Sequence, residues 1–155
     1  MGKRILRSVS AVLLGYVVTA ALVIGGFTTI GVVAPEALPA GAAERASTAV
    51  LVTILALGVF QAAVGGYVTA VVGKRAPLLH AVALAGLIFA LSTISFFTSN
   101  ETQYQPSWYN AGLVAVGVLG ALAGGEVRAA QLHHRLKRED GEPSARKPES
   151  HLSKG

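Results

Sequence analysis

The sequence predicts an all-α integral membrane protein, a four-helix antiparallel bundle with both ends of the chain in the cytoplasm. Three observations lead to this prediction. The 155-residue chain is 52% hydrophobic and only 14% charged, whereas about a quarter of the residues in soluble domains are charged. Four apolar stretches are each long enough to cross a bilayer, which takes about 20 helical residues. Basic residues gather beside alternate ends of these stretches.

The first apolar stretch follows a short basic lead, residues 1–7, and covers about residues 8–34 without a charged residue. It is longer than a span requires, which predicts a tilted helix, a kink near Gly25 and Gly26, or a helix that projects beyond the bilayer. A cleaved secretory signal is the competing interpretation, because the basic lead, the apolar run and the Ala40-Gly41-Ala42 triplet match its parts. Signal peptides have apolar runs of about 7–15 residues, so the length favours an uncleaved first span.

The next two apolar stretches form a predicted helical hairpin, with spans over about residues 49–72 and 77–98. Residues 73–76 make a short basic turn between them. Pro77 begins the third span at the first helical position, where a backbone N–H would have no partner within the helix in any case. The segment before the hairpin, residues 35–48, is rich in proline and small residues and predicts a loop.

The fourth span is predicted over about residues 108–126. It opens with a Trp-Tyr pair, which suits the headgroup level of a bilayer. With this span, the predicted transmembrane domain covers residues 8–127. Residues 128–140 continue as a basic juxtamembrane helix that we expect at the membrane surface. Residues 141–155 are rich in Gly, Pro, Ser, Lys and Glu and predict a disordered cytoplasmic tail.

The basic residues determine the predicted orientation. The loop between the first two spans contains Arg45 alone, and the loop of residues 99–107 contains no basic residue. The other basic residues near the span ends lie in the lead, in the turn of the hairpin and after the fourth span: Lys3, Arg4, Arg7, Lys74, Arg75, Arg128, Arg135, Lys137 and Arg138. Because such residues stay on the cytoplasmic side, both termini are predicted to be cytoplasmic. We expect these side chains to contact anionic phospholipid headgroups, and no nucleic acid.

Small residues predict how the helices pack. Lipid gives helices no hydrophobic reason to associate, so contacts depend on close approach between small side chains. Two series at four-residue spacing are the candidates: Gly58, Ala62, Gly66 and Ala70 in the second span, and Gly117, Ala121 and Gly125 in the fourth. Around these series, residues 56–70 match residues 115–129 at eight of fifteen positions, all Ala, Gly or Val. We interpret this match as convergent packing rather than a duplication.

Three polar or ionisable residues are candidates for function. Gln61, at the centre of the second span, could bind a substrate or ion, but an interhelical hydrogen bond is the favoured interpretation. His80, one turn inside the third span, could bind a proton; a role at the membrane interface or in helix capping is favoured. Glu126 could pair with Lys74 or Arg75, or remain solvated at the interface.

Five hydroxyl side chains lie in the halves of the first and third spans that are remote from the basic segments: Thr28, Thr29, Ser92, Thr93 and Ser95. They could line a small hydrated vestibule. Hydroxyl groups in membrane helices more often bond to their own backbone, so the vestibule is the weaker interpretation.

No catalytic residue, metal site or cofactor is predicted, and we do not expect an enzyme. The chain has no cysteine, which excludes disulfides and thiolate chemistry. His133 and His134 are adjacent, so on a helix they diverge by about 100° and make a poor pair of metal ligands. The spans also lack a nucleophile–base pair and a set of Asp, Glu and His ligands.

The segment Gly65–Gly86, GGYVTAVVGKRAPLLHAVALAG, combines a Gly-Gly-Tyr helix end, a basic turn, a proline and a His-Ala pair. It resembles a motif of small, uncharacterised bacterial inner-membrane proteins with about four spans. The resemblance covers 22 of the 155 residues; it implies a bacterial inner membrane and no activity.

Together these features predict a small structural or accessory membrane protein that acts through helix packing, with another copy of itself or another membrane protein as its partner. The alternative is an oligomeric subunit of a small transporter or channel. Against this alternative, no acidic or basic side chain lies at the centre of a predicted span, where proton-coupled carriers keep one.

Overall fold

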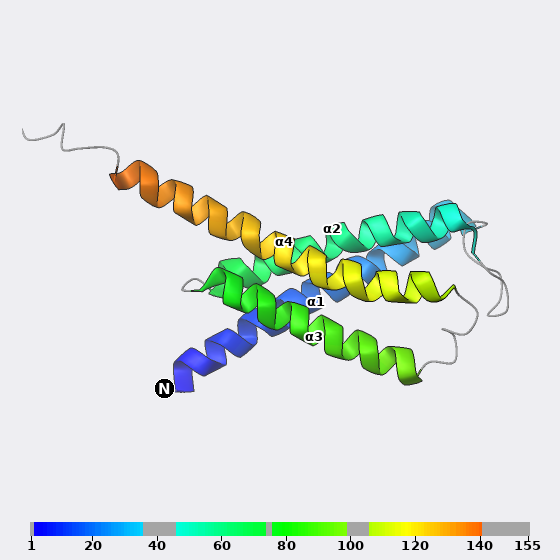
Figure 1. Cartoon of the computed structure of the whole chain (residues 1–155), viewed down its shortest axis with the longest axis horizontal. Helices are drawn as coiled ribbons and strands as arrows, with labels where there is room; N and C mark the ends of the chain where they lie inside the picture. The colour runs from blue at the N-terminus through cyan, green and yellow to red at the C-terminus, as the bar shows by residue number, and fades with distance from the viewer. Residues whose placement is uncertain (1, 36–45, 74–75, 99–105, 141–155) are drawn as a thin grey trace, which may run out of the picture.

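The computed structural model describes residues 2–35, 46–73, 76–98 and 106–140. These residues form four helices: α1 (Gly2–Val33), α2 (Thr48–Gly73), α3 (Pro77–Thr98) and α4 (Ser107–Asp140). Consecutive helices run antiparallel and pack into one bundle, with no strand among the described residues (Figure 1). The all-α four-helix bundle is therefore confirmed.

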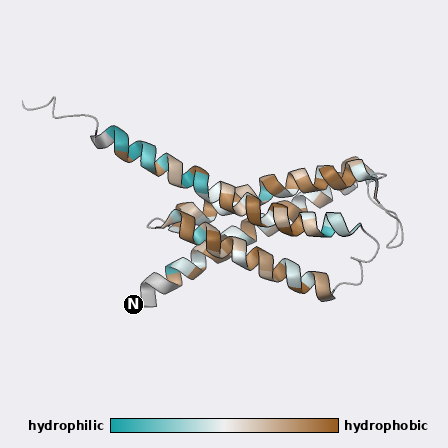
Figure 2. Cartoon of the chain, viewed as in Figure 1, coloured by the Kyte–Doolittle hydropathy of each residue, from teal (hydrophilic) through white to brown (hydrophobic). Residues whose placement is uncertain are grey.

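The helices extend further than the predicted spans at the two ends of the chain. α1 begins within the basic lead, and it continues through Gly25 and Gly26. α4 runs without interruption from the fourth apolar stretch into residues 128–140, and its polar end projects from the bundle (Figures 1 and 2). The basic turn at Lys74 and Arg75 and the tail of residues 141–155 lie outside the described residues.

By length and composition, each helix is able to cross a membrane. The candidate spans are Leu6–Val33, Thr48–Gly73, Pro77–Thr98 and Ser107–Arg138. Many large apolar side chains are exposed on the outside of the bundle; Phe60 and Phe97, for example, are 66% and 79% exposed. Monomeric soluble proteins rarely expose apolar surface on this scale.

The helix α2 is the centre of the bundle, because it packs against each of the other three helices and makes the most extensive contacts of the four. Its most extensive contact is with α4, which runs parallel to it. At this contact the helices approach to backbone distance: a Cβ atom at Gly66 would overlap the carbonyl group of Ala121, and one at Gly124 would overlap that of Ala63. Small residues are thus a steric requirement of the α2–α4 contact.

The helix α4 presents two lines of small residues to two different neighbours. Gly120 and Gly124 face α2, where a Cβ atom at Gly120 would lie 2.6 Å from the carbonyl oxygen of Val59. Gly117 and Gly125 face α3, where a Cβ atom at Gly117 would lie 2.8 Å from Cγ2 of Ile88. The predicted series in α4 therefore packs mainly on α3, and the unpredicted line beside it packs on α2.

In α2, three of the four residues of the predicted series meet α4. A Cβ atom at Gly58 would lie 3.4 Å from Cγ2 of Val116, Ala62 contacts Gly120, and Gly66 contacts Ala121. Ala70 is fully buried.

The helices α1 and α2 pack through two copies of a Gly-x-x-x-Thr arrangement. The side chain of Thr69 in α2 lies against Gly15 of α1, and Thr19 of α1 lies against Gly65 of α2. Each hydroxyl donates a hydrogen bond to the glycine carbonyl of its own helix, at 2.9 Å for both Thr19 and Thr69. Thr69 can therefore be fully buried with its donor satisfied.

The remaining core lies where α1, α3 and α4 meet. Leu84, Ala85 and Ile88 of α3 form a buried cluster with Ala121 of α4. Val12 and Tyr16 of α1 pack against this cluster, together with Val118 and Leu122 of α4.

The packing predicts opposite effects for the same substitution at two glycines. Gly124→Ala places a methyl group against the backbone of α2 and should lower the free energy of unfolding by about 1–3 kcal/mol. Gly86 in α3 has nothing within 4 Å of an added Cβ atom. Gly86→Ala should therefore be neutral, or stabilising by up to about 1 kcal/mol through helix propensity.

Unfolding of purified protein in detergent micelles by added sodium dodecyl sulfate, followed by circular dichroism, measures both variants. Equal effects of the two substitutions would contradict the close α2–α4 contact.

Candidate functional site along the α1–α3 seam

Two cavities open along the seam between α1 and α3, one on each side of the point where these helices meet the core cluster. The first, here called the crevice, has a volume of about 410 Å³ and lies between α1, α3 and α4, towards Val33 and Thr98. The second, called the groove, has a volume of about 360 Å³ and lies between residues 8–13 of α1 and residues 79–83 of α3. Tyr16 lines the crevice and Val12 lines the groove, and both pack on the core cluster between them.

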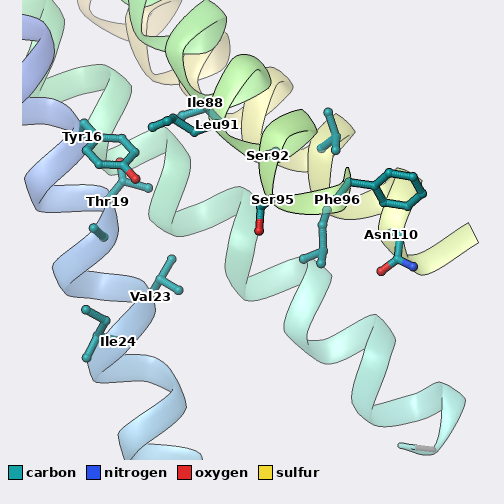
Figure 3. A pocket seen from close by; sticks show the side chains of 13 residues that line it. Tyr16, Thr19, Val23, Ile24, Ile88, Leu91, Ser92, Ser95, Phe96 and Asn110 are labelled. Carbon is teal, nitrogen blue, oxygen red and sulfur yellow. The ribbon is translucent and has the colours of Figure 1, made fainter. Parts of the chain in front are cut away.

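The crevice combines apolar walls with five uncharged polar side chains. Figure 3 shows Tyr16 and Thr19 on α1, Ser92 and Ser95 on α3 and Asn110 on α4. The rest of its lining is aliphatic or aromatic, as at Val23 and Phe96, and contains no charged residue. The crevice therefore suits an uncharged amphiphilic group, such as a polar face of a neighbouring helix, and it supplies no acid or base for proton transfer.

The five hydroxyl residues divide between the vestibule and the favoured interpretation, a bond to their own backbone. Ser92 and Ser95 line the crevice. In contrast, Thr28, Thr29 and Thr93 donate hydrogen bonds of 2.8 Å to carbonyl groups four residues earlier in their own helices.

Sequence reasoning missed Tyr16, Thr19 and Asn110 as lining residues. Thr19 could have been found as a vestibule residue, since its hydroxyl stands four residues after Gly15 on the packing face of the first span. Tyr16 and Asn110 have no local signal of this kind.

The groove has an apolar wall and one polar end. Leu79 and Ala83 of α3 face Val9, Val12 and Leu13 of α1. Ser8 and His80 close the end nearest the start of both helices.

The position of His80 is fixed by three helices. Its Nδ1 atom lies 2.7 Å from the carbonyl oxygen of Ala76 and its Nε2 atom lies 3.2 Å from Oγ of Ser8 in α1. The ring lies against Gly73 of α2, where a Cβ atom would be 2.6 Å from Cγ of His80. A carbonyl only accepts, so Nδ1 carries a proton, and Nε2 of the neutral ring accepts from the Ser8 hydroxyl. This contact with three helices was not predicted, and the predicted roles of His80 at the membrane interface, in helix capping or in proton binding stay predictions.

Gln61 joins α2 to α1. Its Nε2 atom donates a hydrogen bond of 3.0 Å to the carbonyl oxygen of Leu22. The amide lies over Gly26, where a Cβ atom would be 2.6 Å from Nε2. The arrangement matches the favoured interpretation of Gln61 as an interhelical hydrogen-bond donor, and the space for its amide depends on the glycine.

The basic and acidic candidates lie at the polar end of the bundle. Glu126 is exposed on α4, and its predicted partners Lys74 and Arg75 are outside the described residues. The exposed basic residues with described side chains are Arg7, Arg135, Lys137 and Arg138. The side chains of Lys3 and Arg4 are not among those described.

A contact between α2 and α4 at this end was not predicted. The Tyr67 hydroxyl donates to Oε1 of Gln131 at 3.1 Å, and a guanidinium nitrogen of half-buried Arg128 donates to the same oxygen at 3.4 Å. The hydrogen bond between Tyr67 and Gln131 therefore joins α2 and α4 in addition to the contact between their small residues.

In the part of the chain that the structure describes, no group of three or more His, Cys, Asp or Glu residues could hold a metal ion. The rings of His133 and His134 are exposed, with their centroids 6.5 Å apart.

Comparison of the chain with protein-family models, curated proteins and solved structures gives no match. The resemblance of Gly65–Gly86 to small inner-membrane proteins therefore stays a prediction, and function is argued from geometry.

The contact of Gln61 with Gly26 predicts an energetic coupling. Gly26→Ala should displace the amide from the Leu22 carbonyl and lower the free energy of unfolding by about 1 kcal/mol, the usual value of such a bond between membrane helices. In a Gln61→Ala background, Gly26→Ala should have no effect, because the displaced group is absent.

A double-mutant cycle in detergent micelles measures this coupling. Gly25→Ala is the matched control, since nothing lies within 4 Å of an added Cβ atom there. Additive effects of Gly26→Ala and Gln61→Ala would contradict the contact.

Proposed function

We propose that this chain is a small inner-membrane protein with four spans and cytoplasmic termini, and that it serves as a structural or accessory component through helix packing. One observation carries the proposal: polar side chains of the apolar helices form helix contacts rather than a solute path. Gln61 bonds α1, Thr69 is buried against Gly15, and His80 joins three helices.

The lengths of the helices and the exposed apolar surface support insertion in a bilayer. Each helix exceeds the roughly 20 residues that a span needs. The polar surface is concentrated at the end of α4, which projects past the apolar part of the bundle (Figure 2).

The arrangement of the helix ends supports the orientation. The start of α1, the ends of α2 and α3 that flank the hairpin turn, and the end of α4 lie at the same end of the bundle (Figure 1). These are the segments beside which the basic residues gather in the sequence. Basic residues remain on the cytoplasmic side, so one membrane face suits all three.

The crevice supports an accessory role, because hydroxyl groups, such as those of Tyr16 and Ser92, line it on a lateral surface. In lipid, such groups bond the polar side chains of a neighbouring helix. A transmembrane helix of another membrane protein, or of a second copy of this chain, is the partner that this surface fits.

The polar lining of the crevice also favours a second candidate, an oligomeric subunit of a transporter or channel. Two observations weigh against it: the crevice lining carries no charge, and Val12 and Tyr16 pack on the core cluster between the crevice and the groove. A solute-flux assay in proteoliposomes separates the two candidates. The transporter or channel subunit predicts a solute flux that changes with Gln61→Leu and His80→Ala, and unchanged flux would exclude it.

The proposed orientation predicts the labelling of single cysteines, which can be introduced freely because the chain has none. In intact cells, a membrane-impermeant maleimide should label Ser107→Cys, at the start of α4, and leave Lys137→Cys unlabelled. Permeabilised cells should label both. Labelling of Lys137→Cys in intact cells would contradict cytoplasmic termini.

The accessory role predicts where partners crosslink. A photo-crosslinking residue at Ser92, in the crevice, should capture one membrane protein or a second copy of the chain, identified by mass spectrometry. The same residue at Phe60, 66% exposed on α2, should give mainly lipid adducts. Lipid adducts alone at both positions would contradict the accessory role.

A further inference from the structure

We propose that the groove between α1 and α3 binds one anionic phospholipid, with its phosphate at Ser8 and His80 and the start of an acyl chain along the apolar wall. This inference rests on the proposed membrane orientation, which puts the groove in the cytoplasmic leaflet.

The shape of the groove matches a lipid. Its polar groups are at the end nearest the helix starts, and its aliphatic side chains lie deeper, at Val12 and Leu13 of α1 and Ala83 of α3. Ser8 precedes Val12 by one helical turn, and His80 precedes Ala83 by almost one turn. The ligand must therefore carry a polar group and an apolar chain in the order that a phospholipid has when its headgroup faces the cytoplasm.

The polar end can donate to a phosphate oxygen. Ser8 Oγ and His80 Nε2 are 3.2 Å apart, so one oxygen can approach both. When the ring is neutral, the Ser8 hydroxyl is the only donor of the pair and must turn from Nε2 to the phosphate oxygen; when the ring is protonated, Nε2 donates as well. The ring is held by Ala76 and Gly73, so binding requires little reordering of the histidine.

The charged residues of the two helices that line the groove, and of the turn before α3, are basic in the sequence, and the acidic residue Glu126 is on α4, which does not line the groove. The helices α1, α2 and α3 contain no acidic residue. Arg7 is exposed beside Ser8. In the sequence, Arg4 precedes Ser8 by four residues, and Lys74 and Arg75 directly precede Ala76. Basic pockets between helices on the cytoplasmic side are typical sites for anionic headgroups. The basic residues flank the groove rather than line it, since neither cavity has Asp, Glu, Lys or Arg in its lining.

Native mass spectrometry of the full chain in a neutral detergent tests the assignment. The probes are phosphatidylglycerol and phosphatidylcholine with identical acyl chains. We expect one phosphatidylglycerol to be retained at least tenfold more tightly than phosphatidylcholine. Inorganic phosphate at the same concentration should not bind, because it has no acyl chain to occupy the groove.

Two kinds of variant separate the polar and apolar parts of the site. The double variant Ser8→Ala/His80→Gln should lose the preference for the anionic lipid, with His134→Gln, on the exposed part of α4, as its control. Ala83→Trp should fill the groove and abolish retention without changing the charge. Its control is Ala90→Trp, at an exposed position of α3 that lines neither cavity.

Equal retention of the two lipids, or undiminished retention by Ala83→Trp, would overturn the lipid site. Circular dichroism of each variant verifies that the helices are intact. The cysteine labelling described above separates this result from a failure of the proposed function. Normal labelling without lipid selectivity overturns the groove assignment alone, whereas inverted labelling overturns the orientation and, with it, the placement of the groove in the cytoplasmic leaflet.

Discussion

The close approach of α2 and α4 is the constraint on which the rest of the bundle depends. Gly66 meets the carbonyl group of Ala121, and Gly124 meets that of Ala63, so neither helix can carry a side chain at these points. In the bilayer that we propose for this chain, contacts of this kind rely on packing at short distance, because lipid gives helices no hydrophobic reason to associate. α2 makes such contacts with α1 as well, at Gly65. The central helix is therefore held at these points by backbone proximity.

The parallel register of α2 and α4 gives a physical reason for the similarity between residues 56–70 and 115–129. Two parallel helices that cross closely need small residues at the same level in both helices. Ala62 lies beside Gly120, one residue from the position that the alignment pairs with it. Mutual packing is thus sufficient to produce a match of Ala, Gly and Val, and the polar positions of the two segments are free to differ, as at Gln61 and Gly120.

The helices could be predicted from the sequence, and the contacts only in part. Uninterrupted apolar length and Pro77 define the helices because these signals are local. The neighbour of each small residue cannot be predicted from the local sequence. Gly117 faces α3 and Gly120 faces α2, and both of these faces of α4 carry small residues. Gln61 could be interpreted, since a buried amide at the centre of a span needs a partner. Tyr16 and Asn110 could not be predicted as lining residues. The crevice exists only where α1 diverges from α3 and α4, and no sequence motif indicates where helices diverge.

The division of the α1–α3 seam connects packing with function. Val12 and Tyr16 pack on the core cluster around Leu84, and this contact lies between the crevice and the groove, whose polar end is formed by Ser8 and His80. The two cavities consequently differ in the ligand they suit: hydrogen-bonding groups of a neighbouring helix in one, an anionic headgroup in the other. Because both cavities share the same small core, a loss of contact between α2 and α4 would alter both. A substitution inside one cavity would leave the other intact. The geometry therefore allows a lipid and a partner helix to bind this chain at the same time, on separate parts of one seam.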